Sequence, residues 1–178
     1  MTTFNLDGLR ELFAHMEWAD AVVWRAALAH PPAVADTRLR DLLLHLHFVQ
    51  RAFLNVWQSR PLTFPKREEF PDIAAVQTWS NPYYAELAAF LATVDAASLG
   101  RPIEMPWIAE FEQRSGRRFE KPSMAETMFQ VTSHSTYHRG QVNARLREVG
   151  GEPPLVDFIA WVWFGKPAPQ WMSAGSSA

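Results

Sequence analysis

The chain has 178 residues and no cysteine, and its 17 Lys and Arg against 19 Asp and Glu leave a formal net charge of −2. The lack of cysteine excludes disulfides, thiolate metal ligands and a cysteine nucleophile, and the small net charge gives no electrostatic reason to expect nucleic acid or a membrane surface as partner. Because we find neither a signal peptide nor an apolar run near the ~20 residues that span a bilayer, we expect a cytoplasmic protein. The length favours a single domain over residues 1–170, followed by a flexible tail at 171–178.

Two long helices are predicted in the first third of the chain. The first covers about 6–29 and is ended by Pro31 and the proline after it, because proline cannot continue a helix. The second covers about 36–59, with Asp36 or the following threonine as its cap. Within the first helix, Asp20 falls among the apolar positions of one stripe, which is an odd place for a carboxylate.

Two further long helices are predicted in the rest of the chain, with an interruption between them. The third covers about 72–97, where Pro82 breaks or kinks it and the preceding Asn can serve as a fresh cap. The stretch 103–121 alternates poorly and carries a Ser-Gly pair between two arms, so we expect a short hairpin or irregular excursion. The fourth helix covers about 123–149, and the apolar segment 155–165 is expected to pack a helical turn or two across the others. The pattern predicts an all-α protein built as a four-helix bundle.

The pair His134 and His138 is the most informative feature of the chain. A spacing of four residues brings both side chains onto one face of the last long helix. Two imidazoles held in this way can grip one transition-metal ion. Since two ligands rarely complete a site, a third must come from elsewhere.

The second helix offers two candidates for the third ligand, His45 and His47. On a helical wheel, six apolar residues lie within roughly a quadrant of His45: Leu42, Leu46, Val49, Ala52, Phe53 and Val56. A histidine buried there needs a partner, because an unsatisfied buried polar group costs about 1–3 kcal/mol. His47 falls on the far side near Arg40 and Arg51, where water can solvate it. We therefore predict that His45 joins His134 and His138 in the interior, leaving an open position for water, with His47 as the alternative.

Three stretches of the chain resemble the DinB/YfiT-like superfamily of metalloenzymes: MEWADAVVW, HLHFVQRAF and HSTYHRGQVNARL. The last contains the family's HxxxHRGQ motif, and His45 takes the position of the histidine on the second helix. Gln50 departs from the pattern, since the family often has Glu there. The resemblance implies an up-and-down four-helix bundle, a homodimer and a bound divalent metal, with zinc or nickel first and iron or manganese as alternatives.

The resemblance also indicates the kind of chemistry to expect. Characterised members of the family include metal-dependent S-transferases and isomerases that use low-molecular-weight thiols, so we expect a small-molecule substrate of that class. Two alternative functions stay open: a stress-response protein that binds a metal or small ligand without turnover, and a metal-dependent hydrolase. A purely structural bundle, in which the histidines only hydrogen-bond one another, stays open as well. The motifs HExxH, GxGxxG and GxxxxGK[ST] are absent. We expect the 8 Trp and 12 Phe mainly in the core, with some lining a pocket beside the metal.

Four side chains are candidates to support the predicted ligands. Asp20 could orient a ligand imidazole, could act as the general base of a hydrolase, or could pair with an arginine inside the bundle. Asp41 lies one turn before His45 and could orient it instead. Gln141 and Arg139 could contact the ligands or be structural, and a structural role is favoured for Arg139.

Overall fold

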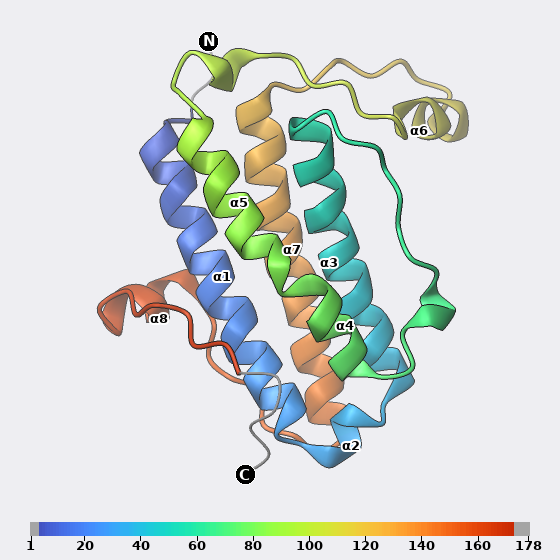
Figure 1. The fold of residues 1–178 in the computed structure, drawn as a ribbon, viewed down its shortest axis with the longest axis vertical. Coiled ribbons are helices and arrows are strands. Elements are labelled where there is room, and N and C mark those ends of the chain that lie inside the picture. Colours follow the sequence, from blue (N-terminus) through green and yellow to red (C-terminus); the bar gives the residue numbers. More distant parts are fainter. Residues whose placement is uncertain (1–3, 173–178) are drawn as a thin grey trace.

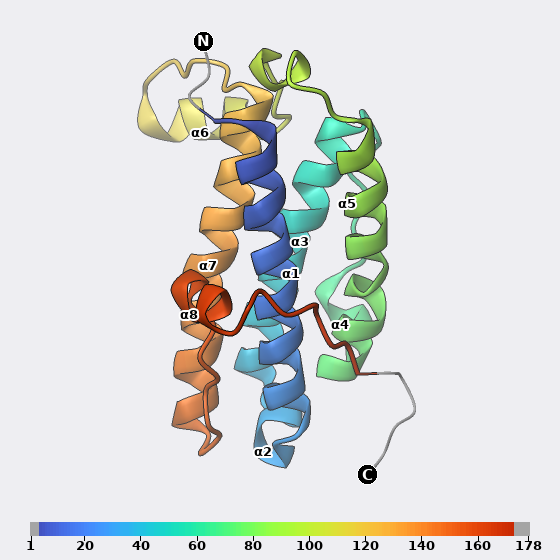
Figure 2. The ribbon, with the colours of Figure 1, turned by 90° about the vertical axis from the view of Figure 1, so that its left-hand side faces the viewer.

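The computed structural model describes residues 4–172, and the regular structure within this range is helical. The long segments that run along the molecule are α1 (Leu6–Leu28), α3 (Thr37–Trp57), α4 (Ile73–Ser80), α5 (Pro82–Thr93) and α7 (Met124–Glu148). They lie side by side, with α4 and α5 following each other along one flank (Figures 1 and 2). The predicted all-α class is confirmed. Residues 173–178 of the predicted tail lie outside the described range.

The three longest helices begin and end for local reasons. Asn5 caps α1 by accepting a hydrogen bond from the amide of Gly8, and Asp36 caps α3 by accepting one from the amide of Leu39. Ser123 caps α7 as part of a capping box with Glu126. Each cap satisfies amides that the first helical turn leaves without partners. After α1, the short helix α2 (Pro31–Val34) turns the chain toward α3.

The third predicted helix is divided at Pro82. Proline at the first position of α5 removes the amide that would continue α4, so the two helices meet there. Asn81 was expected to cap α5 with its side chain, but it is itself helical and makes no such bond. The helical segment ends at Thr93, short of the predicted residue 97.

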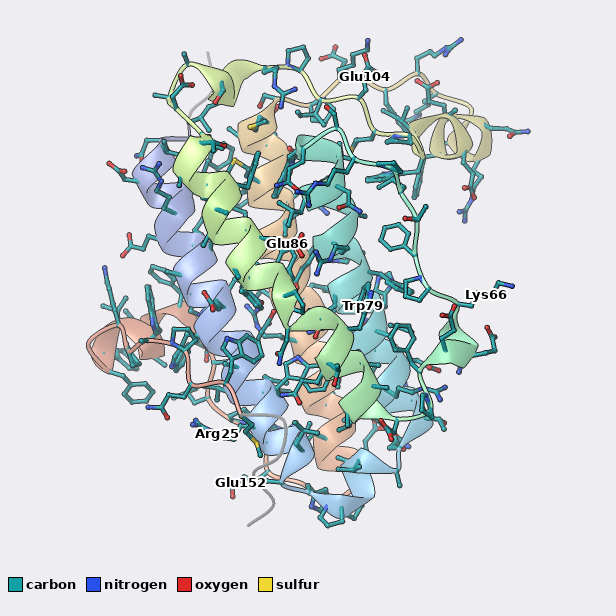
Figure 3. The ribbon with its side chains drawn as sticks, in the orientation of Figure 1. Arg25, Lys66, Trp79, Glu86, Glu104 and Glu152 are labelled. Atoms are coloured by element: carbon teal, nitrogen blue, oxygen red, sulfur yellow. The ribbon has the colours of Figure 1, made fainter. Side chains whose placement is uncertain are left out.

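Aromatic packing and ion pairs attach α4 and α5 to α3. Trp79 of α4, labelled in Figure 3, packs edge-on against Phe48 of α3, with ring centroids 5.0 Å apart. Glu86 of α5, also labelled in Figure 3, accepts hydrogen bonds or ion pairs from Arg51 at 2.7 Å and from Arg60 at 3.2 Å. These contacts hold α4 and α5 on one side of α3.

The stretch expected to be a short hairpin or irregular excursion contains a short helix, α6 (Ile108–Ser115), and no hairpin is found in it. Gly116, read from the sequence as part of a turn, adopts φ 68° and closes this helix in the left-handed conformation. Residues 103–122 form an arm that leaves the other helices and returns to the same place (Figure 1). Its base is closed by backbone hydrogen bonds from Ile103 to Pro122 and from Met124 to Arg101, both 2.8 Å long. We call this segment the α6 arm.

The C-terminal part of the described chain crosses α1. The helix α8 (Phe158–Trp163) lies against α1, where Trp161 is buried with Trp18, and Figure 2 shows the chain continuing across that face. Trp171 then packs on Tyr84 of α5, with ring centroids 5.2 Å apart. Within residues 4–172, none of the helices combines the length and the apolar character that crossing a membrane requires.

Candidate metal centre

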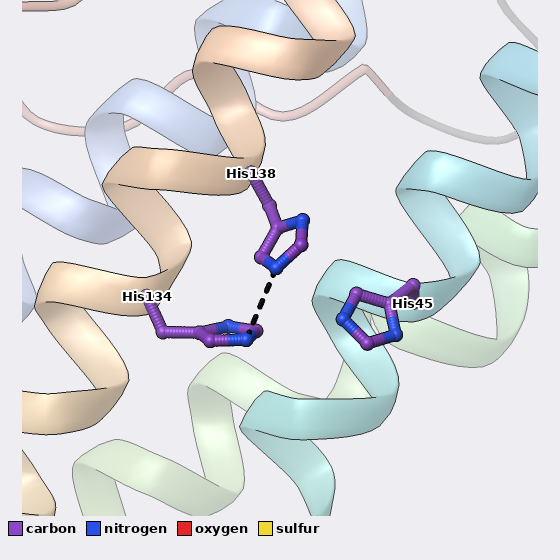
Figure 4. A group of neighbouring side chains, drawn as sticks. All are labelled: His45, His134 and His138. Atoms are coloured by element: carbon purple, nitrogen blue, oxygen red, sulfur yellow. Dashed lines mark hydrogen bonds between the residues drawn. The ribbon is translucent and has the colours of Figure 1, made fainter.

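The most extensive contact between helices is that of α3 with α7, and the predicted ligands lie at this contact. His134 and His138 are one turn apart on α7, and their Nε2 atoms are 3.1 Å from each other. The ring of His45 on α3 lies 4.5 Å from that of His138 and 5.6 Å from that of His134, measured between centroids. All three rings face the same space between the two helices (Figure 4).

One nitrogen of each histidine can therefore be chosen so that the three atoms lie within 4.8 Å of one another. In a tetrahedral zinc site with Zn–N bonds of 2.0–2.1 Å, two ligand nitrogens are separated by roughly 3.3 Å. The 3.1 Å between His134 and His138 is close to that value. The donor set is three imidazoles without a carboxylate, which is a set that suits a divalent transition metal. The residues present therefore fit the metal that the sequence implies.

The site lies at the edge of the α3–α7 contact and not in the interior, where the sequence analysis placed it. His45 is exposed, and His134 and His138 are half-buried. A ligand can thus approach from solvent.

The electrostatics of the site favour neutral rings. Burial, together with the neighbouring His138 and His45, lowers the pKa of His134 to about 4. Burial and the proximity of His138 also lower the pKa of His45. A neutral imidazole has a free lone pair at neutral pH, which is the form that binds a metal.

Gln141 fixes the orientation of one of the rings. The Nδ1 of His138 lies 2.8 Å from Oε1 of Gln141. Because an amide oxygen only accepts hydrogen bonds, Nδ1 carries the hydrogen, and the lone pair of Nε2 points at the cluster. Gln141 thus contacts a predicted ligand, which was one of the two roles considered for it. Asp41, the other candidate beside His45, is instead held by Arg40 and Arg67.

The structure corrects the prediction for His47. This residue was placed on the solvated side of the helix, yet it is buried. Its Nε2 accepts a hydrogen bond from the indole N–H of Trp24 at 2.8 Å, and its Nδ1 lies 2.8 Å from Oε1 of Gln50. Since an indole nitrogen only donates, Nε2 is the unprotonated nitrogen and Nδ1 donates to Gln50. Both nitrogens of His47 are occupied within the protein.

The error arose because polar residues occupy the middle of the buried face of α3. The buried side chains of this helix are Leu39, Leu43, Leu44, Leu46, His47, Gln50, Phe53, Leu54 and Trp57. A wheel that counts only apolar residues places the centre of this face too far toward His45. His45 belongs to the cluster although it does not lie on the buried stripe.

A buried polar network lies behind the histidine cluster. The side-chain amide of Gln50 donates to Asp20 at 2.8 Å and to the hydroxyl of Ser135 at 3.1 Å. Tyr84 donates its hydroxyl hydrogen to Asp20, and Arg139 donates from Nη1 to Asp20 at 2.8 Å. The network therefore joins α1, α3, α5 and α7.

This network settles two readings of the sequence. Asp20 pairs with an arginine inside the bundle, and its bonds go to Tyr84, Gln50 and Arg139, not to a ligand imidazole. Gln50 accepts from His47 with its oxygen and donates to Asp20 with its nitrogen. A glutamate there would place a second carboxylate against Asp20, whereas the amide of Gln50 donates to it.

Sequence reasoning missed Trp24, Tyr84 and Ser135 as members of the network. One signal was available for Trp24, because it lies four residues after Asp20 and so shares its helix face. Tyr84 comes from a helix whose rotation depends on packing against α1, and nothing local indicates its partner.

Comparison with known families identifies the family of this chain. The family model described as DinB family matches residues 1–168. No curated protein sequence matches the chain. The match covers nearly the whole chain, including all three histidines of the cluster. The chain therefore belongs to the DinB family.

Proposed function

We propose that this protein is a metal-dependent enzyme acting on a small molecule, with a divalent metal held by His45, His134 and His138. The observation that carries the proposal is the convergence of three imidazole nitrogens within 4.8 Å from two helices. Zinc or nickel is the first choice and iron or manganese the alternatives, because imidazole serves all of these ions. We propose further that α1, α3, α7 and the α4–α5 column are the four-helix bundle of DinB-like proteins.

When bound, a metal of this kind supplies a Lewis acid that binds a thiol or polarises a carbonyl. The residues around the proposed metal would then have different roles. His45 and His134 line a cavity of about 540 Å³, so a small molecule can sit beside the ligands. Gln141 keeps the Nε2 of His138 aimed at the cluster. This arrangement supports an S-transferase or an isomerase using a low-molecular-weight thiol.

The two alternative functions are less well supported. A hydrolase needs a general base near the reacting water, and Asp20, the only candidate, is committed to Tyr84, Gln50 and Arg139. A protein that binds a metal without turnover is expected to have a closed site with a fourth protein ligand. The group of metal-binding side chains found within residues 4–172 has three members and adjoins an open cavity, which favours exchange with substrate.

Elemental analysis tests the proposal. The protein is purified without a histidine tag and compared with His45→Ala, His134→Ala and His47→Gln. We expect about one metal per chain in the parent and in His47→Gln, and little in the two alanine variants. Glutamine can accept from Trp24 and donate to Gln50, so His47→Gln preserves the fold as a matched control.

Two results would contradict the assignment. Metal retained in His45→Ala but lost in His47→Gln would make His47 the third ligand. A parent protein that binds no metal even after incubation with zinc or nickel would remove the metal and the enzyme proposal together.

A further inference from the structure

The cavity beside the histidine cluster has a wall of unusual composition. It lies between α3, the loop after α3, the α6 arm and α7. Apart from His45 and His134, its larger side chains are Phe48, Phe53, Phe64, Trp107, Phe111 and Gln130. A molecule in this cavity would touch aromatic rings on several sides while its end reached the histidines.

The rings are held in place as two pairs. Phe48 of α3 packs against Phe64 of the following loop, with centroids 5.4 Å apart. Phe53 of α3 packs edge-on against Trp107 of the α6 arm at 5.3 Å. Both distances fall in the range where aromatic pairs attract each other, so the wall is formed before any ligand arrives. Phe111 also lines the cavity and is 50% exposed.

Away from the two histidines, the cavity wall offers nothing to balance a charge. Among the described residues that line it, none is Asp, Glu, Lys or Arg, and Gln130 is the only amide. An ionised group placed among the aromatic rings would lose water without gaining a partner, which is costly. An uncharged aromatic group would instead gain apolar burial and edge or face contacts with the rings.

We infer that the substrate of this site carries an uncharged aromatic group, which sits among Phe48, Phe53, Phe64 and Trp107. Another atom of the same substrate would then lie beside His45 and His134, where it could bind the proposed metal. This inference rests on the proposed function and narrows its substrate class. A volume of about 540 Å³ is within the range of small-molecule sites.

The first test uses the metal-free protein and a neutral aromatic probe, N-phenyl-1-naphthylamine, whose fluorescence rises in apolar surroundings. Trp107→Ala removes part of the wall, and Ala52→Trp fills the cavity from α3. We expect each change to weaken binding by about tenfold or more. Trp163→Ala is the control, because Trp163 is 73% exposed on α8 and does not line this cavity. It should leave probe binding unchanged.

The control also tests whether the probe binds instead to the exposed apolar side chains of α8. Probe binding that is lost in Trp163→Ala and unchanged in Trp107→Ala and Ala52→Trp would place the probe at α8 and overturn the inference. Circular dichroism of each variant confirms that the helices are retained. Trp107→Ala removes side-chain volume and Ala52→Trp adds it. If one of these variants fails to fold, the other still tests whether the probe binds in this cavity.

A second test separates this inference from the proposed function. Cobalt-loaded protein is titrated with phenylmethanethiol and with 2-mercaptoethanol, two uncharged thiols of similar acidity, and binding is followed by the cobalt absorption bands. We expect at least tenfold tighter binding of the aromatic thiol, with the preference lost in Trp107→Ala. Cobalt uptake with equal binding of both thiols would overturn the inference and leave the metal site standing. If no cobalt is taken up, the proposed function fails, and the probe titration alone decides whether the cavity takes an aromatic group.

Discussion

Arg139 of α7 and Asp20 of α1 form an ion pair with a distance of 2.8 Å between Nη1 and Oδ1, and each side chain is only 2% exposed. The pair therefore joins two helices inside the protein. Arg139 directly follows the proposed ligand His138, so the position of that turn of α7 depends on the pair. A second donor of Arg139, Nη2, bonds Thr136 at 2.9 Å.

Removing one member of this pair should be costly. Asp20→Asn leaves the buried charge of Arg139 uncompensated, and we expect a loss of about 3–5 kcal/mol in the free energy of unfolding. Arg139→Met should cost a similar amount. The double variant should lose less than the sum, because neither partner then remains as an isolated charge. Urea denaturation of the metal-free proteins measures all three. Strictly additive losses would show that the two side chains do not interact.

Gln141 should control metal affinity without being a ligand. Gln141→Ala frees the ring of His138 to rotate, and the loss of such a support typically weakens metal binding by about 10–100-fold. Gln141→Glu should bind at least as tightly as the parent, because a carboxylate accepts the same hydrogen bond more strongly. Competition with a chelator gives the affinities. Gln113→Ala, on the exposed face of α6, is the matched control and should not change them.

The two glycines Gly140 and Gly151 should respond in opposite ways to alanine. A Cβ at Gly140 meets no atom within 4 Å among the described residues, so close helix packing does not require glycine there. Gly140→Ala should stabilise α7 by up to about 1 kcal/mol. A Cβ at Gly151 would lie 2.4 Å from Cδ1 of the fully buried Leu146, so Gly151→Ala should destabilise the protein. Thermal unfolding distinguishes the two signs. A destabilised Gly140→Ala would mean that this position has a role outside helix propensity.

His15 should make the protein less stable in mild acid. It is buried among Trp18, Phe158 and Trp161, and burial lowers its pKa below the ordinary value of 6.5. As the pH falls through 6.5, the unfolded chain takes up this proton before the folded chain does. The free energy of unfolding contributed by His15 is therefore full above that pH and decreases below it.

The measurement compares urea denaturation at pH 7.5 and at pH 5.0 for metal-free parent and His15→Gln. The side-chain amide of glutamine reaches as far as Nε2 of histidine, so it can still donate to the carbonyl of Val156, which His15 Nε2 contacts at 2.9 Å, but it does not titrate. The variant should lose less stability between the two pH values. Any pH-independent cost of the substitution cancels in this comparison. An equal loss in both proteins would rule out His15 as a source of the acid sensitivity.

The ends of the long helices could be predicted from the sequence because their causes are local. Pro31 follows the end of α1, Asp36 caps α3, and the capping box of Ser123 and Glu126 begins α7. Each effect acts over about one turn of helix, so all the residues that produce it lie within a few positions of one another in the sequence. The small segment after residue 103 was harder. The same Gly116 that ends α6 is also compatible with a tight turn, and the choice depends on contacts of the arm.

The rotation of α3 could not be predicted, because its buried residues His47 and Gln50 depend on polar partners from two other helices, α1 and α7. His47 is buried only because Trp24 and Gln50 satisfy its ring nitrogens. The helical wheel does not show these partners. From the wheel alone, His47 was expected to be solvated and His45 to be buried. The HxxxHRGQ motif still identified His134 and His138, which lie one turn apart on one helix. The candidate set His45, His134 and His138 is brought together by the structure, while the reason given for His45 was wrong.

The α6 arm begins and ends at one point, where the backbone bonds of Ile103 to Pro122 and of Met124 to Arg101 close it. Changes in the length or sequence of the segment between them should leave the remaining helices undisturbed, since a loop closed at its base tolerates insertion at modest entropic cost. Yet this segment supplies Trp107 and Phe111 to the cavity beside the histidines. Replacing the sequence of the α6 arm should therefore change which substrate the proposed site accepts. The proposed metal ligands and the buried residues that hold them would remain unchanged.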